Sequence, residues 1–253
     1  MKLYILGNGF DVAHGLPTSY SNFNKYISNN DTGNPNMAEE LDKLFKLDEG
    51  WGNFESALGN PDKEQEEEYD RLGLIDIFNQ VLQEWFDEWI SSIKKTDQYK
   101  NLEPKHGYLT DDLYIDFNYI EVLESFYNIP VSNVCHIHGH TVKKSFNNEA
   151  KMIFGHGDDA RKDSKLARLT YKDTKSLYED NEDFFKKIYN SSIEEIIVMG
   201  FSYSLIDKYY FEKINKNLPK VKWLLNYHTD EDKTRLEAFV NKVGIRDYKI
   251  KEI

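Results

Sequence analysis

Four groups of residues that can bind a ligand or move a proton each follow an apolar stretch of the chain. Each stretch has the composition of a β-strand, and ligands of open α/β sheets bind at the carboxyl ends of the strands. Glycine turns, asparagine, histidine and serine suit nucleotide binding and hydrolysis. We therefore predict that the four groups line one crevice: Gly7-Asn8-Gly9-Phe10-Asp11, Asn118-Tyr119, His138-Gly139 and Gly200-Phe201-Ser202.

The first group begins like the glycine-rich turn of a dinucleotide-binding fold. Gly7 and Gly9 let the backbone come close to a ligand, because glycine has no Cβ and tolerates positive φ. The motif is incomplete, since Val12 stands where the fingerprint G-x-G-x-x-G has its third glycine. A nucleotide site and a tight strand-to-helix turn both remain open. Asp11 and His14 are compatible with a helix cap as well as with a ligand contact.

Three histidines form the second candidate feature. His136, His138 and His140 alternate, which would place them on one face of a continuous strand. Imidazoles are common metal ligands, and His156 and Asp158 would complete such a site. We expect no metal, however, because a glycine follows His138 and ends the strand. His138 is the candidate general base, since histidine exchanges a proton near neutral pH. The alternative is a structural histidine.

The elements that must position these residues are strands. The run Ile196–Met199 is apolar without alternation, which is typical of a strand covered on both faces in a parallel sheet. Helices are predicted at Ser176–Asn190 and at Asp230–Val243, which Gly244 ends, and a loop at Asp158–Lys175. We predict an α/β fold with a Rossmann-like, mostly parallel sheet of these strands: Lys2–Leu6, Leu113–Phe117, Val134–His138, Met152–Phe154, Ile196–Met199, Val221–Tyr227 and Ile245–Ile250.

A helical insertion is predicted after the first strand. Residues 31–105 show no strand pattern, and we place them within a single α/β domain that spans residues 1–253. The longest periodic segment of the insertion runs from Leu72 to Ile93, with apolar residues at helical spacing. We interpret it as a core-facing helix. Two tryptophans in the stripe leave a partner-facing or dimer helix as the alternative.

Composition limits the function classes. The 253-residue chain has a formal net charge of −12, which argues against strong nucleic-acid binding, because such binding depends on lysine and arginine. The single cysteine, Cys135, excludes an intramolecular disulfide and a cysteine-based zinc ribbon. No apolar run in the sequence approaches the length of a membrane span, which is about 18 residues. The apolar run at the N-terminus is too short for the apolar region of a signal peptide. We expect a cytoplasmic protein that does not bind membranes.

The motifs together resemble the AbiH family of bacterial abortive-infection proteins, which defend against phage. The blocks GNGFDVAHGLPTSY, WGNFE, FNYIEVLE, HIHGH, MIFGHG and MGFSYSLID follow the order of the family over most of the chain, and the first block is quite specific. This family is in turn similar to sirtuins and to sirtuin-like NAD-hydrolysing defence domains. The resemblance therefore implies a sirtuin-like sheet that binds NAD as its substrate and needs no metal.

The resemblance also implies a role for each predicted site residue. Asn118 would position the ribose or a water molecule, and His138 would be the general base. Cleavage of the nicotinamide–ribose bond passes through an oxocarbenium-like state, so an oriented water molecule and a base are a coherent pair. The nucleotide would be bound by Gly7, Asn8, Gly9, Phe10, Asp11 and Gly139, with Gly200 and Ser202 at its adenosine side.

Three hypotheses follow. The first is an NAD⁺ glycohydrolase of phage defence that is inactive until infection. The second is a module that binds a nucleotide without cleaving it and signals to a partner; it is favoured by Ile120, which replaces the acid of the sirtuin-like pattern and is followed by Glu121 and Glu124. The third is a metal-dependent hydrolase or nuclease that uses the histidines. A homo-oligomer or a partner protein is compatible with each hypothesis.

Overall fold

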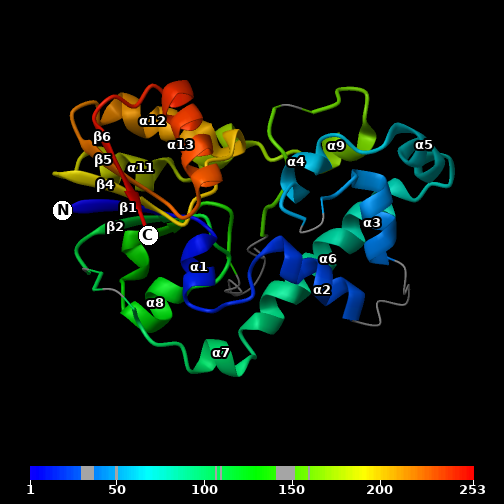
Figure 1. Cartoon of the computed structure of the whole chain (residues 1–253), viewed down its shortest axis with the longest axis horizontal. Helices are drawn as coiled ribbons and strands as arrows, with labels where there is room; N and C mark the ends of the chain where they lie inside the picture. The colour runs from blue at the N-terminus through cyan, green and yellow to red at the C-terminus, as the bar shows by residue number, and fades with distance from the viewer. Residues whose placement is uncertain (30–36, 49–50, 106, 109, 141–151, 159) are drawn as a thin grey trace. The chain divides into compact units, whose positions relative to one another are not determined.

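A computed structural model describes residues 1–29, 37–48, 51–105, 107–108, 110–140, 152–158 and 160–253. In these parts of the chain, six parallel strands form one sheet in the order β3-β2-β1-β4-β5-β6 (Figure 1). The order reverses between β1 and β4, as it does in doubly wound nucleotide-binding sheets. The strands are β1 (Lys2–Leu6), β2 (Leu113–Asp116), β3 (Val134–His136), β4 (Glu195–Met199), β5 (Lys222–Tyr227) and β6 (Tyr248–Glu252).

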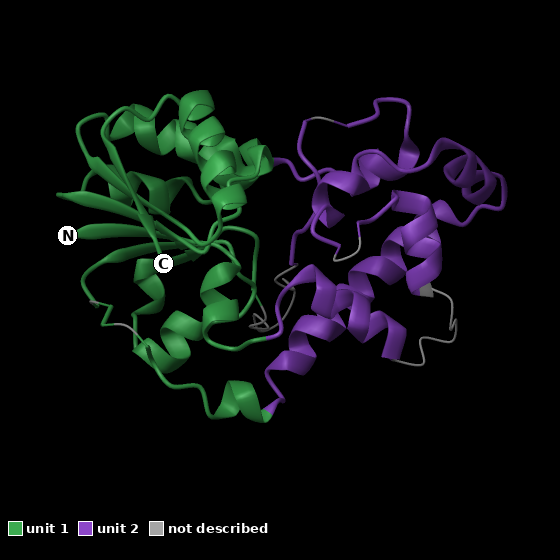
Figure 2. Cartoon of the chain, in the orientation of Figure 1, with its two compact units in different colours: residues 1–16, 97–151, 174–253 green, residues 17–96, 152–173 purple. Residues whose placement is uncertain are grey.

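The chain divides into two compact units (Figure 2). Unit 1 comprises residues 1–16, 97–151 and 174–253, and it holds the sheet. Its helices are α1 (Gly9–Ala13), α7 (Asp97–Lys100), α8 (Val122–Tyr127), α10 (Thr174–Asp180), α11 (Glu182–Tyr189), α12 (Lys208–Asn217) and α13 (Asp230–Val243), with the 3₁₀ turns η1 (Val131–Asn133) and η2 (Leu205–Asp207).

Unit 2 comprises residues 17–96 and 152–173, and its described elements are all helices. These are α2 (Tyr20–Asn29), α3 (Met37–Phe45), α4 (Phe54–Leu58), α5 (Lys63–Arg71), α6 (Ile75–Ile93) and α9 (Lys165–Leu169). Of the predicted insertion, residues 31–36 and 49–50 lie outside the described residues. The remainder contributes residues 37–96 to unit 2 and residues 97–105 to unit 1.

Helices cover both faces of the unit 1 sheet. Helices α11, α12 and α13 lie on one face, and α1 and α8 lie on the other (Figure 1). Leu3 and Ile5 of β1 pack into the core of the first face, whereas the rings of Tyr4 and Tyr114 stack with centroids 5.1 Å apart. This alternation follows from the two-residue period of a strand. The predicted α/β fold is confirmed: a Rossmann-like parallel sheet, with helices inserted after its first strand.

Helix α13 shows how local sequence sets the ends of an element. Thr229 accepts a hydrogen bond from the backbone N–H of Asp232, whose carboxylate accepts one from the backbone N–H of Thr229. This capping box satisfies two donors at the helix start. Gly244 ends the helix with φ of 79°, in the left-handed region that glycine tolerates. The predicted bounds of this helix and its glycine cap are confirmed.

The apolar stripe of α6 forms much of the core of unit 2, which confirms the core-facing interpretation. Phe23 of α2 stacks on Trp89 with ring centroids 5.0 Å apart. Leu72, at the start of the predicted stripe, is 62% exposed because it lies at the C-cap of α5, before α6 begins. Neither α6 nor any other helix in the described ranges is long and apolar enough to cross a membrane. The buried residues of α6 are Ile75, Phe78, Leu82, Trp85, Phe86, Trp89, Ile90 and Ile93.

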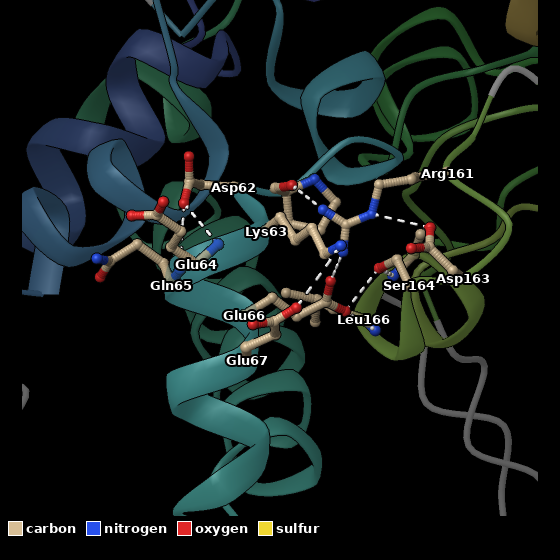
Figure 3. A network of polar contacts seen from close by, with 12 residues as sticks. Asp62, Lys63, Glu64, Gln65, Glu66, Glu67, Arg161, Asp163, Ser164 and Leu166 are labelled. Atoms are coloured by element: carbon tan, nitrogen blue, oxygen red, sulfur yellow. Dashed lines mark hydrogen bonds and ion pairs between the residues drawn. The ribbon is translucent and has the colours of Figure 1, made fainter.

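A buried carboxylate joins α5 to the start of α9 within unit 2 (Figure 3). Glu66 is 5% exposed and forms an ion pair with Arg161. Its other oxygen accepts hydrogen bonds from the hydroxyl of Ser164 at 2.7 Å and from the backbone N–H of Leu166 at 2.9 Å. Arg161 also pairs with Asp163 at 3.2 Å. Because the carboxylate is both paired and hydrogen-bonded, the cost of its burial is offset.

Four sequence predictions differ from the structure. The prediction of a strand at Met152–Phe154 is wrong. This segment belongs to unit 2, where Phe154 packs against other aromatic rings. The predicted loop Asp158–Lys175 contains α9 and the start of α10. The predicted helix Ser176–Asn190 is broken at Asn181 into α10 and α11. The last strand was predicted at Ile245–Ile250, but β6 begins at Tyr248. Ile245 lies before the strand and packs in the core.

Candidate active site

The loops after β1 and β4 touch where the strand order reverses. A Cβ on Gly9 would lie 2.6 Å from the Cα of Gly200, and one on Gly7 would lie 2.6 Å from the carbonyl oxygen of Gly200. Gly200 has φ of +61°, and its carbonyl accepts a 2.8 Å hydrogen bond from the N–H of Gly9. The three glycines are thus required by the contact between the loops. The N–H of Gly9 is therefore hydrogen-bonded to the backbone of the protein and not to a ligand.

Asn118 ties the same loop to the end of β2. Its side chain is buried, and Nδ2 donates hydrogen bonds to the carbonyl of Gly7 at 3.3 Å and to Oδ1 of Asp116 at 2.8 Å. The backbone N–H of Asn118 donates to the same Asp116 oxygen at 2.9 Å. The amide nitrogen therefore holds two strand ends together at the edge where a ligand is predicted.

His138 and Asp207 form a buried pair on the sheet face covered by α12. Nε2 of His138 lies 3.4 Å from Oδ1 of Asp207, and the residues are 3% and 7% exposed. The ring of Phe117 meets that of His138 edge-on, with centroids 5.1 Å apart. His138 follows β3, and Asp207 is the N-cap of α12 beyond β4, so the fold brings together residues far apart in sequence. A carboxylate this close to an imidazole favours the protonated form of the ring.

The three alternating histidines do not share one face. Strand β3 ends at His136, and Gly139 turns the chain with φ of +78° while its N–H donates to the carbonyl of His136 at 3.1 Å. Alternation holds only inside a strand, so the turn separates His138 from the others. The rings of His136 and His140 lie together, with centroids 4.5 Å apart.

The charge of His136 is fixed by its partners. Nε2 lies 2.9 Å from Oε1 of Glu124, and Nδ1 lies 3.3 Å from the carbonyl oxygen of Asn118. Both oxygens accept hydrogen bonds, so both ring nitrogens donate and the ring is cationic. Burial alone would lower the pKa of His136, but the hydrogen bond to Glu124 and the charge of Asp116 raise it to about 9.

His136 and His140 lie among four acidic side chains. We call this group the acid–histidine cluster: Asp11, Asp116, Glu121, Glu124, His136 and His140. Nδ1 of His140 lies 3.0 Å from Oε1 of Glu121, which repeats the imidazole–carboxylate pairing of its neighbour. Asp11 and Asp116 are both buried, and burial raises the pKa of both carboxyl groups above the ordinary aspartate range.

The described residues offer no ready metal site. No group of three histidine, cysteine or acidic side chains among them lies close enough together to hold a metal ion. His156 and Asp158, the other ligands considered from the sequence, belong to unit 2. The two ring nitrogens of His156 each lie 2.6 Å from a backbone carbonyl, of Gly157 and of Ala167.

Comparison with protein families decides the assignment. The family model described as bacteriophage abortive infection AbiH matches residues 3–68 and 62–227. The chain belongs to the AbiH family. This confirms the resemblance of the motifs and links the protein to bacteriophage abortive infection. The matched residues include His138, Asp207 and the whole acid–histidine cluster. No significant match was found among curated proteins or among solved structures.

The remaining residues predicted to bind a nucleotide in this AbiH chain fall into two groups. Asn8 and Ser202 are exposed in the loops after β1 and β4. Ser204, rather than Ser202, caps the turn that follows, with its hydroxyl 3.3 Å from the N–H of Ile206. Phe10 is buried and packs against the ring of His14, the C-cap residue of α1. Of these residues, only Asn8 and Ser202 are open to solvent, and their predicted role in nucleotide binding stays a prediction.

Besides Glu121, three acids at this edge were not among the predicted site residues. Asp116 ends β2, Glu124 lies on α8, and Asp207 follows the β4 loop. The sequence feature that these acids share is their position, within a few residues of a strand end or of the loop that follows it. That signal is weak in a chain with 44 acidic residues, so only the tertiary structure selects these three.

Proposed function

We propose that this AbiH-family protein is an NAD⁺ glycohydrolase that acts in abortive infection by cleaving the nicotinamide–ribose bond. The observation that carries the proposal is the buried His138–Asp207 pair at the carboxyl edge of a parallel sheet. Ligands of doubly wound sheets bind at this edge, where the strand order reverses. The similarity of the motifs to sirtuin-like NAD-hydrolysing domains supports the choice of substrate.

In the proposed reaction, His138 accepts a proton from the attacking water molecule. The water oxygen bonds to C1′ of the ribose as the bond from C1′ to the nicotinamide nitrogen breaks. The electron pair of that bond neutralises the pyridinium ring, so nicotinamide leaves without needing an acid. Asp207, 3.4 Å from His138, stabilises the imidazolium that forms.

The loops supply the binding surface in this proposal. The close contact of Gly7 and Gly9 with Gly200 fixes the loops after β1 and β4 relative to each other. The exposed Asn8 and Ser202 then contact the nucleotide from these two loops. Fixed loops reduce the ordering that binding requires, which favours affinity.

A second candidate is a module that binds a nucleotide without cleaving it. Asn118, predicted to orient the ribose or water, uses its amide nitrogen to bind Gly7 and Asp116. Ile120, in place of the acid of the sirtuin-like pattern, is fully buried. Both observations favour a site that holds its ligand at the same edge and passes the signal to a partner.

The test is incubation of purified protein with NAD⁺ and chromatographic separation of the products. Wild type should release nicotinamide, and His138→Ala should release it at least about 100-fold more slowly, because a general base contributes 10²–10⁴-fold. The matched control is His228→Ala, which removes an exposed histidine and should behave as wild type. Thermal melts of all three proteins exclude loss of folding as the cause.

The same three proteins are also compared in phage-infected cells. This experiment tests the proposal even if the enzyme is inactive until infection. NAD⁺ should fall in infected cells that express wild type or His228→Ala, and remain constant with His138→Ala. Defence without loss of NAD⁺ would contradict the proposal. Calorimetry that shows tight binding of uncleaved nucleotide would instead establish the second candidate.

A further inference from the structure

Asp11 lies in the helix directly behind the glycine turn, and its carboxylate is 1% exposed. Neither of its oxygens has a hydrogen-bond partner among the residues that the structure describes. A buried carboxylate without partners is costly, and native proteins usually provide such a group with a donor or a cation. This side chain therefore requires an explanation that the contacts among the described residues do not give.

The groups around Asp11 do not neutralise it. Its electrostatic neighbours are Asp116 at the end of β2, His136 at the end of β3 and Glu121 at the N-cap of α8. The two acids repel the charge of Asp11. The positive charge of His136 is already shared with Glu124 and Asp116, which lie 2.9 and 3.8 Å from its ring nitrogens. The cluster thus has more carboxylates than cations.

We propose that Asp11 recognises the positive charge of the nicotinamide ring, so that the site binds NAD⁺ in preference to NADH. This inference rests on the proposed function, because it names the feature by which the same site selects its substrate. Asp11 follows the turn that joins β1 to α1, at the sheet edge where the nucleotide is proposed to bind.

The two forms of the cofactor make a sharp comparison. NAD⁺ and NADH share every group except the ring, which is a pyridinium cation in one and neutral in the other. A carboxylate in a low-dielectric surrounding attracts the cation strongly and gains nothing from the neutral ring. During cleavage the positive charge moves from the ring to the ribose, so the same carboxylate also favours the oxocarbenium-like state.

The protonation of Asp11 adds a second consequence. Burial, the charge of Asp116 and the charge of Glu121 raise the pKa of Asp11, and only His136 acts against them. The carboxyl group therefore holds its proton more tightly without ligand than an exposed aspartate does. A cationic ring favours the ionised form, so binding of NAD⁺ should release a proton and binding of NADH should not.

The experiment measures the affinities of NAD⁺ and NADH by calorimetry, in the His138→Ala background so that NAD⁺ is not consumed. We expect NAD⁺ to bind at least tenfold more tightly than NADH. Asp11→Asn should remove most of that preference. Asp111→Asn takes the same charge from an exposed position in unit 1 and should retain it, which controls for the net charge of the protein. Repetition in buffers of different ionisation enthalpy counts the released protons.

Each outcome separates the inference from the proposed function. Equal affinities in the His138→Ala background overturn the inference, and this result needs no Asp11 variant to fold. A preference that survives Asp11→Asn in a protein with a normal thermal melt overturns it as well. If wild type cleaves NAD⁺ and either result is obtained, the proposed function stands without the inference. If neither nucleotide binds and NAD⁺ is not cleaved in infected cells, the proposed function fails.

Discussion

Two histidines separated by one residue have opposite environments in unit 1. His136 is bound at both ring nitrogens, by Glu124 and by the carbonyl of Asn118. His138 faces Asp207 at 3.4 Å, and the rings of Phe117 and Tyr210 lie near its imidazole ring. The turn after β3 gives the two side chains different neighbours. Proximity in sequence therefore says little about role, and the partners of each ring decide it.

The comparison assigns stability to one histidine and chemistry to the other. A histidine that donates from both nitrogens already carries its second proton at neutral pH and cannot accept another. A buried histidine beside a carboxylate resembles the base of a hydrolase. The following substitutions test that division, beginning with the largest expected effect.

Asp207→Asn should lower the rate of NAD⁺ cleavage by about 10²–10⁴-fold, because the imidazolium at His138 loses its counter-charge. The change keeps the shape of the side chain, so the thermal melt should remain close to that of wild type. Initial rates of nicotinamide release measure the effect. A rate within threefold of wild type would show that the pair does not serve catalysis.

His136→Ala should lower the free energy of unfolding by about 3–5 kcal/mol, because it leaves the buried Asp116 and the partly buried Glu124 without their cation. His138→Ala should cost distinctly less stability while abolishing cleavage. Urea unfolding of both variants, followed by circular dichroism, makes the comparison. Equal losses of stability would remove the distinction between the two histidines.

Stability should fall as the pH rises from 6.5 to 9. The pKa of His136 is raised to about 9 in the folded state, against 6.5 for the free side chain, so its contribution is complete below pH 6.5. The contribution is lost as the pH passes 9, and the shift corresponds to about 3 kcal/mol. The pKa values of Asp11 and Asp116 are also raised in the folded state. Their ionisation therefore also lowers stability as the pH rises, and this effect begins at a lower pH than that of His136.

The variant His136→Gln isolates the part that belongs to this histidine. Its unfolding free energy should change less between pH 6.5 and 9 than that of wild type, while His228→Gln should follow wild type. Denaturant midpoints measured across the range provide the readout. An unchanged slope in His136→Gln would place the titration on other groups.

Asp11→Asn should stabilise the protein by about 1 kcal/mol at pH 8, the smallest effect considered, because an amide avoids the cost of a buried unpaired carboxylate. Since the pKa of Asp11 is raised in the folded state, the wild-type residue destabilises more as the pH rises. The difference between the two proteins should therefore shrink near pH 4. A variant less stable than wild type at pH 8 would show that Asp11 has a stabilising partner.

The local elements of unit 1 followed from the sequence to a large extent. The apolar run at Ile196–Met199 became a central strand, and the capped pattern at Asp230–Val243 became a helix with those bounds. These succeed because strand burial and helix capping depend on residues near one another in the chain. Met152–Phe154 failed as a strand because an apolar triplet packs equally well in a helical unit, and tertiary contacts decide which.

The sequence by itself determined that glycine, asparagine, histidine and serine stand behind the strands of an AbiH-family α/β fold, because strand ends are local features. Only the tertiary structure paired His138 with Asp207, gathered the acid–histidine cluster and buried Asp11 where none of the described residues donates to its carboxylate. Pairing across the sheet depends on the strand order and on the turn at Gly139, which set the distances between residues far apart in the chain. Charge and burial then gave two neighbouring histidines different chemistry, and neither can be read from residue spacing.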